Sequence, residues 1–170
     1  MMKILGTTAA VAAIALTATP AFAAPVEPVR QATATARIIK PLTLTWVADL
    51  NFGSITLVDT GPTTVAVARD GSRSCPGTAV TCSGASSAAA YRITGVNNQV
   101  VTVNAGNVSL ANTTDPTLPS LLMNIDAPAN INLGNSGTAG TPLLIGGNIS
   151  VSGATAEGLY SGTLAVTVEY

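Results

Sequence analysis

The chain has 170 residues, of which 47% are hydrophobic types, 4% are aromatic and 9% are charged. Its formal net charge is −1 and it contains no histidine. The missing basic surplus argues against a nucleic-acid partner, because binding to phosphates requires clustered Lys and Arg. The missing histidine excludes imidazole catalysis and metal sites with imidazole ligands. We therefore expect neither a cofactor nor a metal.

The first 23 residues have the pattern of a secretory signal peptide. Lys3 precedes a largely apolar run over residues 4–18, and Ala21-Phe22-Ala23 supplies the small residues that signal peptidase requires. The alternative, a membrane anchor, needs about 20 apolar residues, which this run does not reach. We predict cleavage after Ala23, which leaves residues 24–170 as one exported domain without a membrane span. Such a protein would reside in the periplasm, at the cell surface or outside the cell.

Residues 31–39 alternate as an amphipathic strand does. One face carries small apolar side chains and the other carries polar ones. The apolar face consists of Ala32, Ala34, Ala36 and Ile38. Pro41 then interrupts the pattern, since proline has no N–H to donate to a sheet. Two interpretations stay open: the segment is the first strand of this chain's own fold, or residues 24–40 carry a donor strand that pairs with a neighbouring subunit.

The rest of the chain reads as short strands between turns. Thr and Val are abundant, and their branched Cβ atoms favour a pleated sheet over a helix. Period-two alternation resumes after Pro41 at Leu42, Leu44 and Trp46, and it recurs in three further segments, residues 64–68, 91–94 and 120–126. The turn residues between these runs are spaced as in an all-β sandwich or barrel.

Cys75 and Cys82 enclose six residues that include Pro76 and Gly77. In an exported protein, a local disulfide at a hairpin tip is the expected state of such a pair. The spacing differs from the C-x-x-C of redox enzymes, and two thiols alone cannot complete a tetrahedral zinc site.

The last eleven residues give the clearest alternation. The face expected to lie in the core carries Tyr160, Leu164, Val166, Val168 and Tyr170. The alternate positions carry Ser, Thr, Ala and Glu residues, so the pattern predicts a half-buried C-terminal core strand.

No catalytic residues emerge from the sequence. The aspartates at positions 49, 59, 115 and 126 are scattered over expected loops and strand ends, where solvated turn carboxylates are the default. Every serine lacks a histidine partner, which removes the usual triad. Asn107, Asn112 and Asn148 begin N-glycosylation sequons, which arise by chance in a chain rich in Asn, Ser and Thr. The chain is therefore expected not to be an enzyme.

Both ends of the mature chain resemble a secreted bacterial family, domain of unknown function 4402. The resemblance rests on the opening residues 32–44 with 48–55, and on the closing residues 146–151 with 158–170. That family is in turn similar to the spore-coat-U-like subunits of archaic chaperone–usher pili. The shared features are Leu50-Asn51-Phe52-Gly53 and Gly158-Leu159-Tyr160-Ser161.

The resemblance implies an immunoglobulin-like β-sandwich that lacks one strand. In such subunits the N-terminal strand of the next subunit fills the gap, and residues 31–39 stand where that strand would be. The expected partners are further copies or sister subunits and a periplasmic chaperone. Such pilus subunits commonly carry a cysteine near the start of the first core strand. The sequence departs from this pattern, because no cysteine precedes Cys75.

Two functions follow as expectations. The first is a structural or adhesive surface protein, pilin-like, that assembles by β-strand addition. The second is a self-complete monomeric sandwich that binds a carbohydrate or matrix component. Sugar binding usually needs exposed Trp or Tyr side chains. After signal cleavage the chain offers only Trp46, Tyr91, Tyr160 and Tyr170 for this purpose, which counts against the second function.

Overall fold

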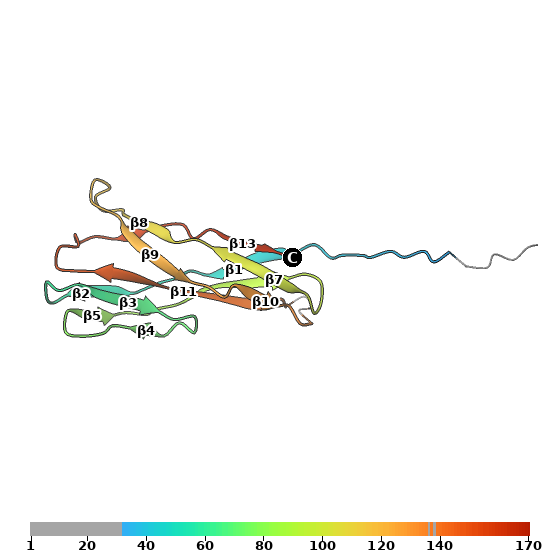
Figure 1. Ribbon diagram of the computed structural model, residues 1–170. Helices are drawn as coiled ribbons and strands as arrows, with labels where there is room; N and C mark the ends of the chain where they lie inside the picture. The colour runs from blue at the N-terminus through green and yellow to red at the C-terminus, as the bar shows by residue number, and fades with distance from the viewer. Residues whose placement is uncertain (1–31, 136, 138) are drawn as a thin grey trace, which may run out of the picture. The chain divides into compact units, whose positions relative to one another are not determined.

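The structure is a computed structural model that describes residues 32–135, 137 and 139–170 (Figure 1). The predicted all-β class is confirmed: the described residues form strands and no helix, and every strand pairing is antiparallel. In chain order the strands are β1 (Thr43–Ala48), β2 (Ser54–Leu57), β3 (Thr63–Val67), β4 (Arg73–Ser74), β5 (Val80–Ser83), β6 (Ala89–Thr94), β7 (Val100–Ala105), β8 (Val108–Asn112), β9 (Leu121–Asp126), β10 (Asn130–Asn132), β11 (Thr141–Val151), β12 (Tyr160–Ser161) and β13 (Val166–Glu169).

The eleven-residue strand β11 organises the largest sheet, whose order is β1-β6-β11-β9-β8-β12. β11 pairs with β6 through residues 141–145. Further along, residues 147–151 pair with β3 and residues 146–149 pair with β9. Because this long strand changes partners along its length, the sheet curls into a half-barrel. Two smaller sheets complete the fold, with orders β10-β7-β13 and β2-β5.

Two groups of buried side chains form the core, and most are the aliphatic members of the alternating runs. The first group contains Val65, Val80, Val108, Leu110, Met123, Ile149 and Val151. The second contains Ala89, Ile93, Val101, Val103, Leu133, Leu143 and Ile145. Leu50, Ile125 and Leu164 pack against both groups, so the two parts of the core are continuous.

The C-terminal segment differs from the expected single strand. It is divided into β12, which pairs with β8, and β13, which pairs with β7. A Cβ at Gly162 would lie 2.8 Å from the carbonyl oxygen of Ser109, so the chain approaches the β8 backbone closely where the two strands separate. Tyr160, Leu164, Val166 and Val168 are half-buried against the core, whereas Tyr170 is 49% exposed.

Residues 38–170 form one compact unit that contains all the described strands. Residues 32–42 belong to no strand of this chain, and the apolar alternation of Ala32, Ala34, Ala36 and Ile38 lies on exposed residues. The predicted signal peptide, residues 1–23, lies outside the described residues. Within the described part of the chain, no helix has the length and apolar character needed to cross a membrane.

Candidate functional site

A groove with a volume of about 1090 Å³ lies between two segments of the described chain. One wall runs along residues 46–57, from the end of β1 through β2, and the other along residues 155–164, which include β12. The floor contains the buried core residues Leu110, Met123 and Val151. The walls add half-buried apolar side chains, namely Leu50, Phe52, Ile55, Leu57, Tyr160 and Leu164. The groove is therefore a channel with an apolar floor that opens onto the first part of the core, and its walls carry both apolar and polar groups.

Both walls end in strand edges that have no partner within the described residues. β1 stands at one end of its sheet and pairs only with β6, and β12 stands at the other end and pairs only with β8. The backbone N–H and C=O groups on such edges are free to pair with an added strand. The half-barrel thus fails to close along the groove.

At one end of the molecule a hydrogen bond ties the C-terminal residue, after β13, to the segment before β1. The hydroxyl group of Tyr170 donates a hydrogen bond to the carbonyl oxygen of Lys40, 3.0 Å away, and accepts one from the N–H of Val96 at 2.9 Å. Tyr170 follows β13, and Lys40 shortly precedes β1. The groove consequently begins beyond this tie and extends toward residues 57 and 155–157.

The turn Leu50-Asn51-Phe52-Gly53 builds the first wall. Asn51 exchanges two backbone hydrogen bonds with Ser87, and its side-chain oxygen accepts a bond from the N–H of Gly53 at 2.8 Å. Gly53 has a φ of 71°, a conformation that costs a residue with a Cβ. The turn directs Leu50 and Phe52 toward the core and leads the chain into β2.

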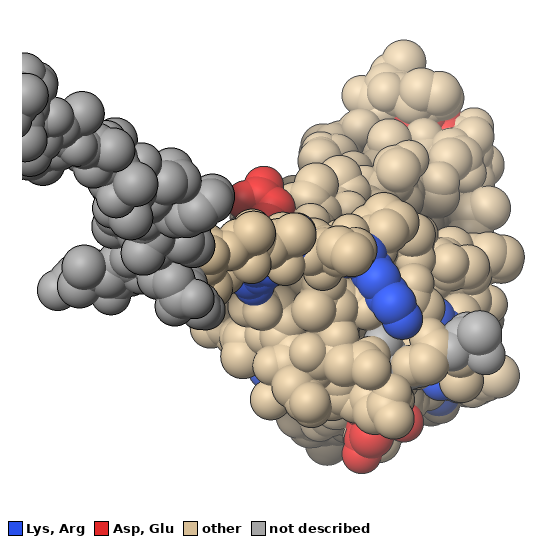
Figure 2. Space-filling view, turned by 90° about the vertical axis from the view of Figure 1, so that its right-hand side faces the viewer, with Lys and Arg blue, Asp and Glu red and all other residues tan. Residues whose placement is uncertain are grey.

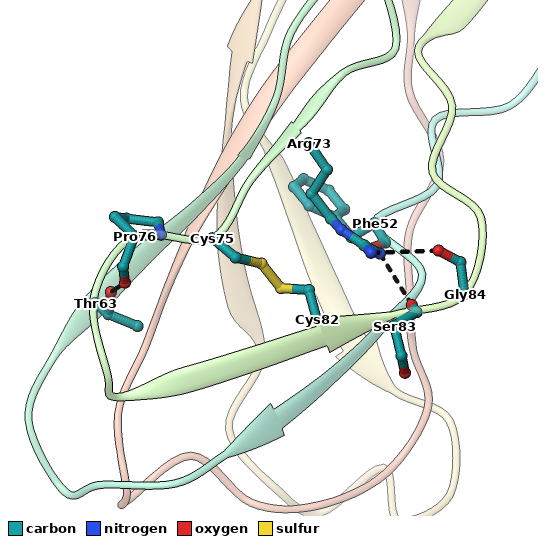
Figure 3. The surroundings of a disulfide bond; sticks show 8 residues. All are labelled: Phe52, Thr63, Arg73, Cys75, Pro76, Cys82, Ser83 and Gly84. Carbon is teal, nitrogen blue, oxygen red and sulfur yellow. Dashed lines mark hydrogen bonds between the residues drawn. A yellow bond between two sulfur atoms is a disulfide. The ribbon is translucent and has the colours of Figure 1, made fainter.

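Arg73 and the disulfide hold β2 and β5 against the rest of the fold (Figure 3). The guanidinium group of Arg73 donates to the carbonyl oxygens of Phe52, Ser83 and Gly84 at 2.7, 3.0 and 3.2 Å. The predicted disulfide is confirmed: Cys75 and Cys82 are bonded, with Cα atoms 6.3 Å apart, and both pack against the first core group. The ribbon β2-β5, which supplies part of one wall, is therefore cross-linked to the end of β4.

Asn112 builds the second wall. It is 1% exposed, and its side-chain amide donates to the carbonyl oxygen of Glu157 at 2.9 Å. Its side-chain oxygen accepts from the N–H groups of Thr114 and Asp115. Gly158 must lack a side chain, since a Cβ there would lie 2.5 Å from the Asn112 amide. The sequence offered only a sequon at Asn112, and the burial of its amide could not be read from that motif.

Aromatic and acidic side chains mark the end of the groove near β1. Trp46 is 59% exposed, lies opposite Tyr91 in the β1-β6 pair, and donates from Nε1 to a carboxylate oxygen of Asp49 at 3.0 Å. Partial burial raises the pKa of Tyr91, and the charge of Asp49 adds to this effect. Asp49 and Glu157 are the charged residues that line the groove, and both are acidic.

Figure 2 looks onto the end of the molecule that carries the C-terminus. In this view acidic and basic residues are separated by broad uncharged areas. This face therefore shows no concentrated patch of either sign.

The structure does not bring the four aspartates together. Each accepts hydrogen bonds from a different neighbour, as in Asp49 with Trp46, Asp59 with Thr60, Asp115 with Thr117 and Asp126 with Arg69. The side-chain and backbone bonds from Thr117 lower the pKa of Asp115. Across residues 32–135, 137 and 139–170 there is no group of three or more potential metal ligands.

Comparison with known protein families matches residues 42–170 to DUF4402, described as a domain of unknown function. The chain belongs to the DUF4402 family. The match begins just before β1 and reaches the C-terminus, so the DUF4402 domain includes all the strands seen among the described residues and both walls of the groove. The segment 31–39 precedes the DUF4402 domain. Neither the curated proteins nor the solved structures provide a match to this chain.

Proposed function

We propose that this protein is a non-enzymatic, exported subunit of a surface polymer that assembles by β-strand addition. The groove of one copy would bind residues 31–39 of a second copy. The observation that carries this proposal is the channel with an apolar floor between two unpaired strand edges, which is the shape that one extended strand fills. Main-chain hydrogen bonds to the edges would supply affinity, and alternate side chains would fill the channel.

The residues of the N-terminal segment suit that role. Ala32, Ala34, Ala36 and Ile38 share one parity, and an extended chain places the first and last of them about 20 Å apart. Small side chains fit a channel whose floor is already formed by buried core residues. A volume of about 1090 Å³ also lies just above the usual range for small-ligand pockets, as expected for an extended polymer segment.

Charge favours a second copy of this chain as the occupant. The groove is lined by two acidic residues, Asp49 and Glu157, whereas residues 31–41 contain the two cations Arg37 and Lys40 and no acid. Opposite charges steer association and help to select the partner. Residues 32–40 are exposed in the chain itself, so they are available for such an interaction.

We further propose the architecture and the assembly partner that the family resemblance implies. The half-barrel would be an immunoglobulin-like sandwich that lacks one strand, and a periplasmic chaperone would occupy the groove before assembly. The disulfide supports an oxidising, extracytoplasmic location. The periplasm and the cell surface are the sites where such a polymer would be built.

A second candidate rests on the aromatic residues at one end of the groove. Trp46 is 59% exposed beside Tyr91, and an exposed indole ring next to polar groups can stack on a sugar. In this alternative the protein would be a self-complete monomer that binds a carbohydrate or matrix component.

Solution size separates the two candidates. We expect the mature chain, residues 24–170, to form oligomers that resist mild denaturant. Deletion of residues 24–39 should give a folded monomer, because all the described strands lie in the remaining unit. Analytical ultracentrifugation and circular dichroism would measure both properties. A mature chain that stays monomeric at high concentration, or a deletion variant that unfolds, would refute strand addition.

A further inference from the structure

We propose that Glu157 of one copy pairs with Lys40 of the incoming copy, so that the added strand enters with its C-terminal end at the Glu157 end of the groove. This inference rests on the proposed function and specifies it further. The added strand would run antiparallel to β12 and parallel to β1. Three independent observations support the assignment.

The first observation is the state of the two groove carboxylates. Asp49 already accepts a hydrogen bond from Trp46 Nε1 at 3.0 Å. Among the described residues, none bonds to the carboxylate of Glu157, whose backbone carbonyl alone is engaged, by Asn112. Asn112 is buried and fixes this carbonyl at 2.9 Å, so the backbone that carries the free carboxylate is held in place. Glu157 is thus the better placed acceptor for an incoming cation.

The second observation is that only one end of the groove is open. The bond between Tyr170 and Lys40 ties the chain after β13 to the chain before β1, and the groove extends from there toward Glu157. Only Ile39 to Leu42 separate Ile38 from the first strand of the incoming copy's own fold. The folded domain of the incoming copy therefore lies immediately after the added strand, and only the open end of the groove has room for it. After the proposed signal cleavage only residues 24–30 precede the strand, too few for a folded domain, so its N-terminal end can lie toward the tied end.

The third observation is parity. In an extended strand, side chains two residues apart point to the same side. Lys40 therefore shares the side of Ala32, Ala34, Ala36 and Ile38, whereas Arg37 points away from the groove. When Ile38 of the added strand lies in the channel, the ammonium group of Lys40 lies just past Ile38, at the end of the groove. Among these residues, Lys40 is the cation that can meet Glu157.

This polarity has a consequence for the assembly. The tied end of the incoming copy would abut the open end of the copy that binds it. Such a heterologous, head-to-tail contact repeats in one direction and gives a filament when the rotation does not close. The junction would carry the Lys40–Glu157 pair at every step.

Cysteine cross-linking in the full mature chain tests the polarity. One variant carries Lys40→Cys and Glu157→Cys, and its matched control carries Lys40→Cys and Asp49→Cys. Under mild oxidation we expect the first variant to form a ladder of covalent oligomers on non-reducing denaturing gels, and the control to remain largely monomeric. Peptide mapping would verify that Cys75 and Cys82 stay bonded to each other in both variants.

The outcomes are separable. A covalent ladder in the control but not in the first variant would show the opposite polarity and overturn this inference, while strand addition stands. Native oligomers that cross-link in neither variant would also overturn it. If no oligomers form at all, even in the parent chain, the proposed function itself fails.

Charge provides an independent measurement. Glu157→Gln should slow assembly roughly two- to five-fold at low ionic strength, as expected for the loss of one exposed ion pair. The difference should disappear at high salt, because exposed charges are then screened. Asp126→Gln, which alters a carboxylate outside this groove, serves as the control for net charge. Equal rates for Glu157→Gln and the parent chain at low salt would contradict the proposed pair.

Discussion

Gly53 shows how one residue can shape the groove. Its φ of 71° lies in the left-handed region, and a Cβ would meet the Arg73 guanidinium and lie 2.7 Å from the carbonyl oxygen of Ser83. Both requirements arise because the turn passes beneath Arg73, which binds the carbonyl oxygen of Phe52. The short motif that links this chain to its family thus has a physical reason: the turn leaves room for a cation that joins three strand ends.

Gly53→Ala should lower the free energy of unfolding by about 1–3 kcal/mol, since it adds backbone strain and displaces Arg73. Gly61→Ala is the matched control, because nothing lies within 4 Å of a Cβ there and its φ is not positive. Urea unfolding followed by circular dichroism measures both variants. Equal stabilities for the two would show that the turn does not depend on glycine.

Some residues could be assigned from the sequence and others could not. The disulfide was predictable because its two cysteines are close in sequence and are the only ones present. The role of Asn112 was not predictable, since it depends on a loop 45 residues further along the chain. Similarly, the bonds from Arg73 reach residues on two other strand ends, and no local pattern reports such contacts.

At the level of elements, the ribbon β2-β5 is the most weakly attached part of the groove. It forms its own two-stranded sheet, and isolated pairs of strands are marginally stable in water. The Arg73 bonds, the Asn51–Ser87 bridge and the disulfide connect it to the neighbouring strands. We infer that the disulfide stabilises the groove wall more than it stabilises the sheet around β11.

Replacing Cys75 and Cys82 with serine should lower the free energy of unfolding by about 2–3 kcal/mol, as expected for a short closed loop. The affinity of the serine variant for a peptide with the sequence of residues 31–40 should also fall. This decrease should be larger than the decrease in the fraction of folded protein alone would cause. Emission of Trp46, the only tryptophan of the chain, reports occupancy, because the added strand would cover its exposed ring. Unchanged peptide affinity in a folded serine variant would contradict this role of the disulfide.

Period-two alternation predicted the type of most elements but not their boundaries. The C-terminal alternation suggested one strand over residues 160–170, yet the structure divides it where Gly162 approaches the β8 backbone. Alternation reports which side chains face inward and does not report where two strands stay within bonding distance. The same limit applies to β11, whose change of partners along its length depends on pairings between distant segments.

At the scale of the whole molecule, the groove results from a sheet order that does not close. The sequence could indicate an all-β fold, but only the three-dimensional arrangement shows that β1 and β12 border the same channel. The segment 31–39 has the alternation of a strand and yet belongs to no strand of its own chain, as far as the described residues 32–39 show. One chain thus contains a segment with the pattern of a strand and a groove that has room for one more strand. Together these two features form the basis of the proposed assembly.

The central claim is that the two unpaired edges receive residues 31–39 of another copy. Hydrogen–deuterium exchange of residues 40–170, measured with and without a peptide of residues 31–40, tests it most directly. The account predicts that exchange slows at the edge amides around residues 46–48 and 160–164, and remains unchanged in β3 and β4, which do not line the groove. A peptide in which Ala34 and Ala36 are replaced by aspartate should have no effect, since charged side chains would be buried in the channel. Unchanged exchange at both edges in the presence of excess native peptide would contradict the account.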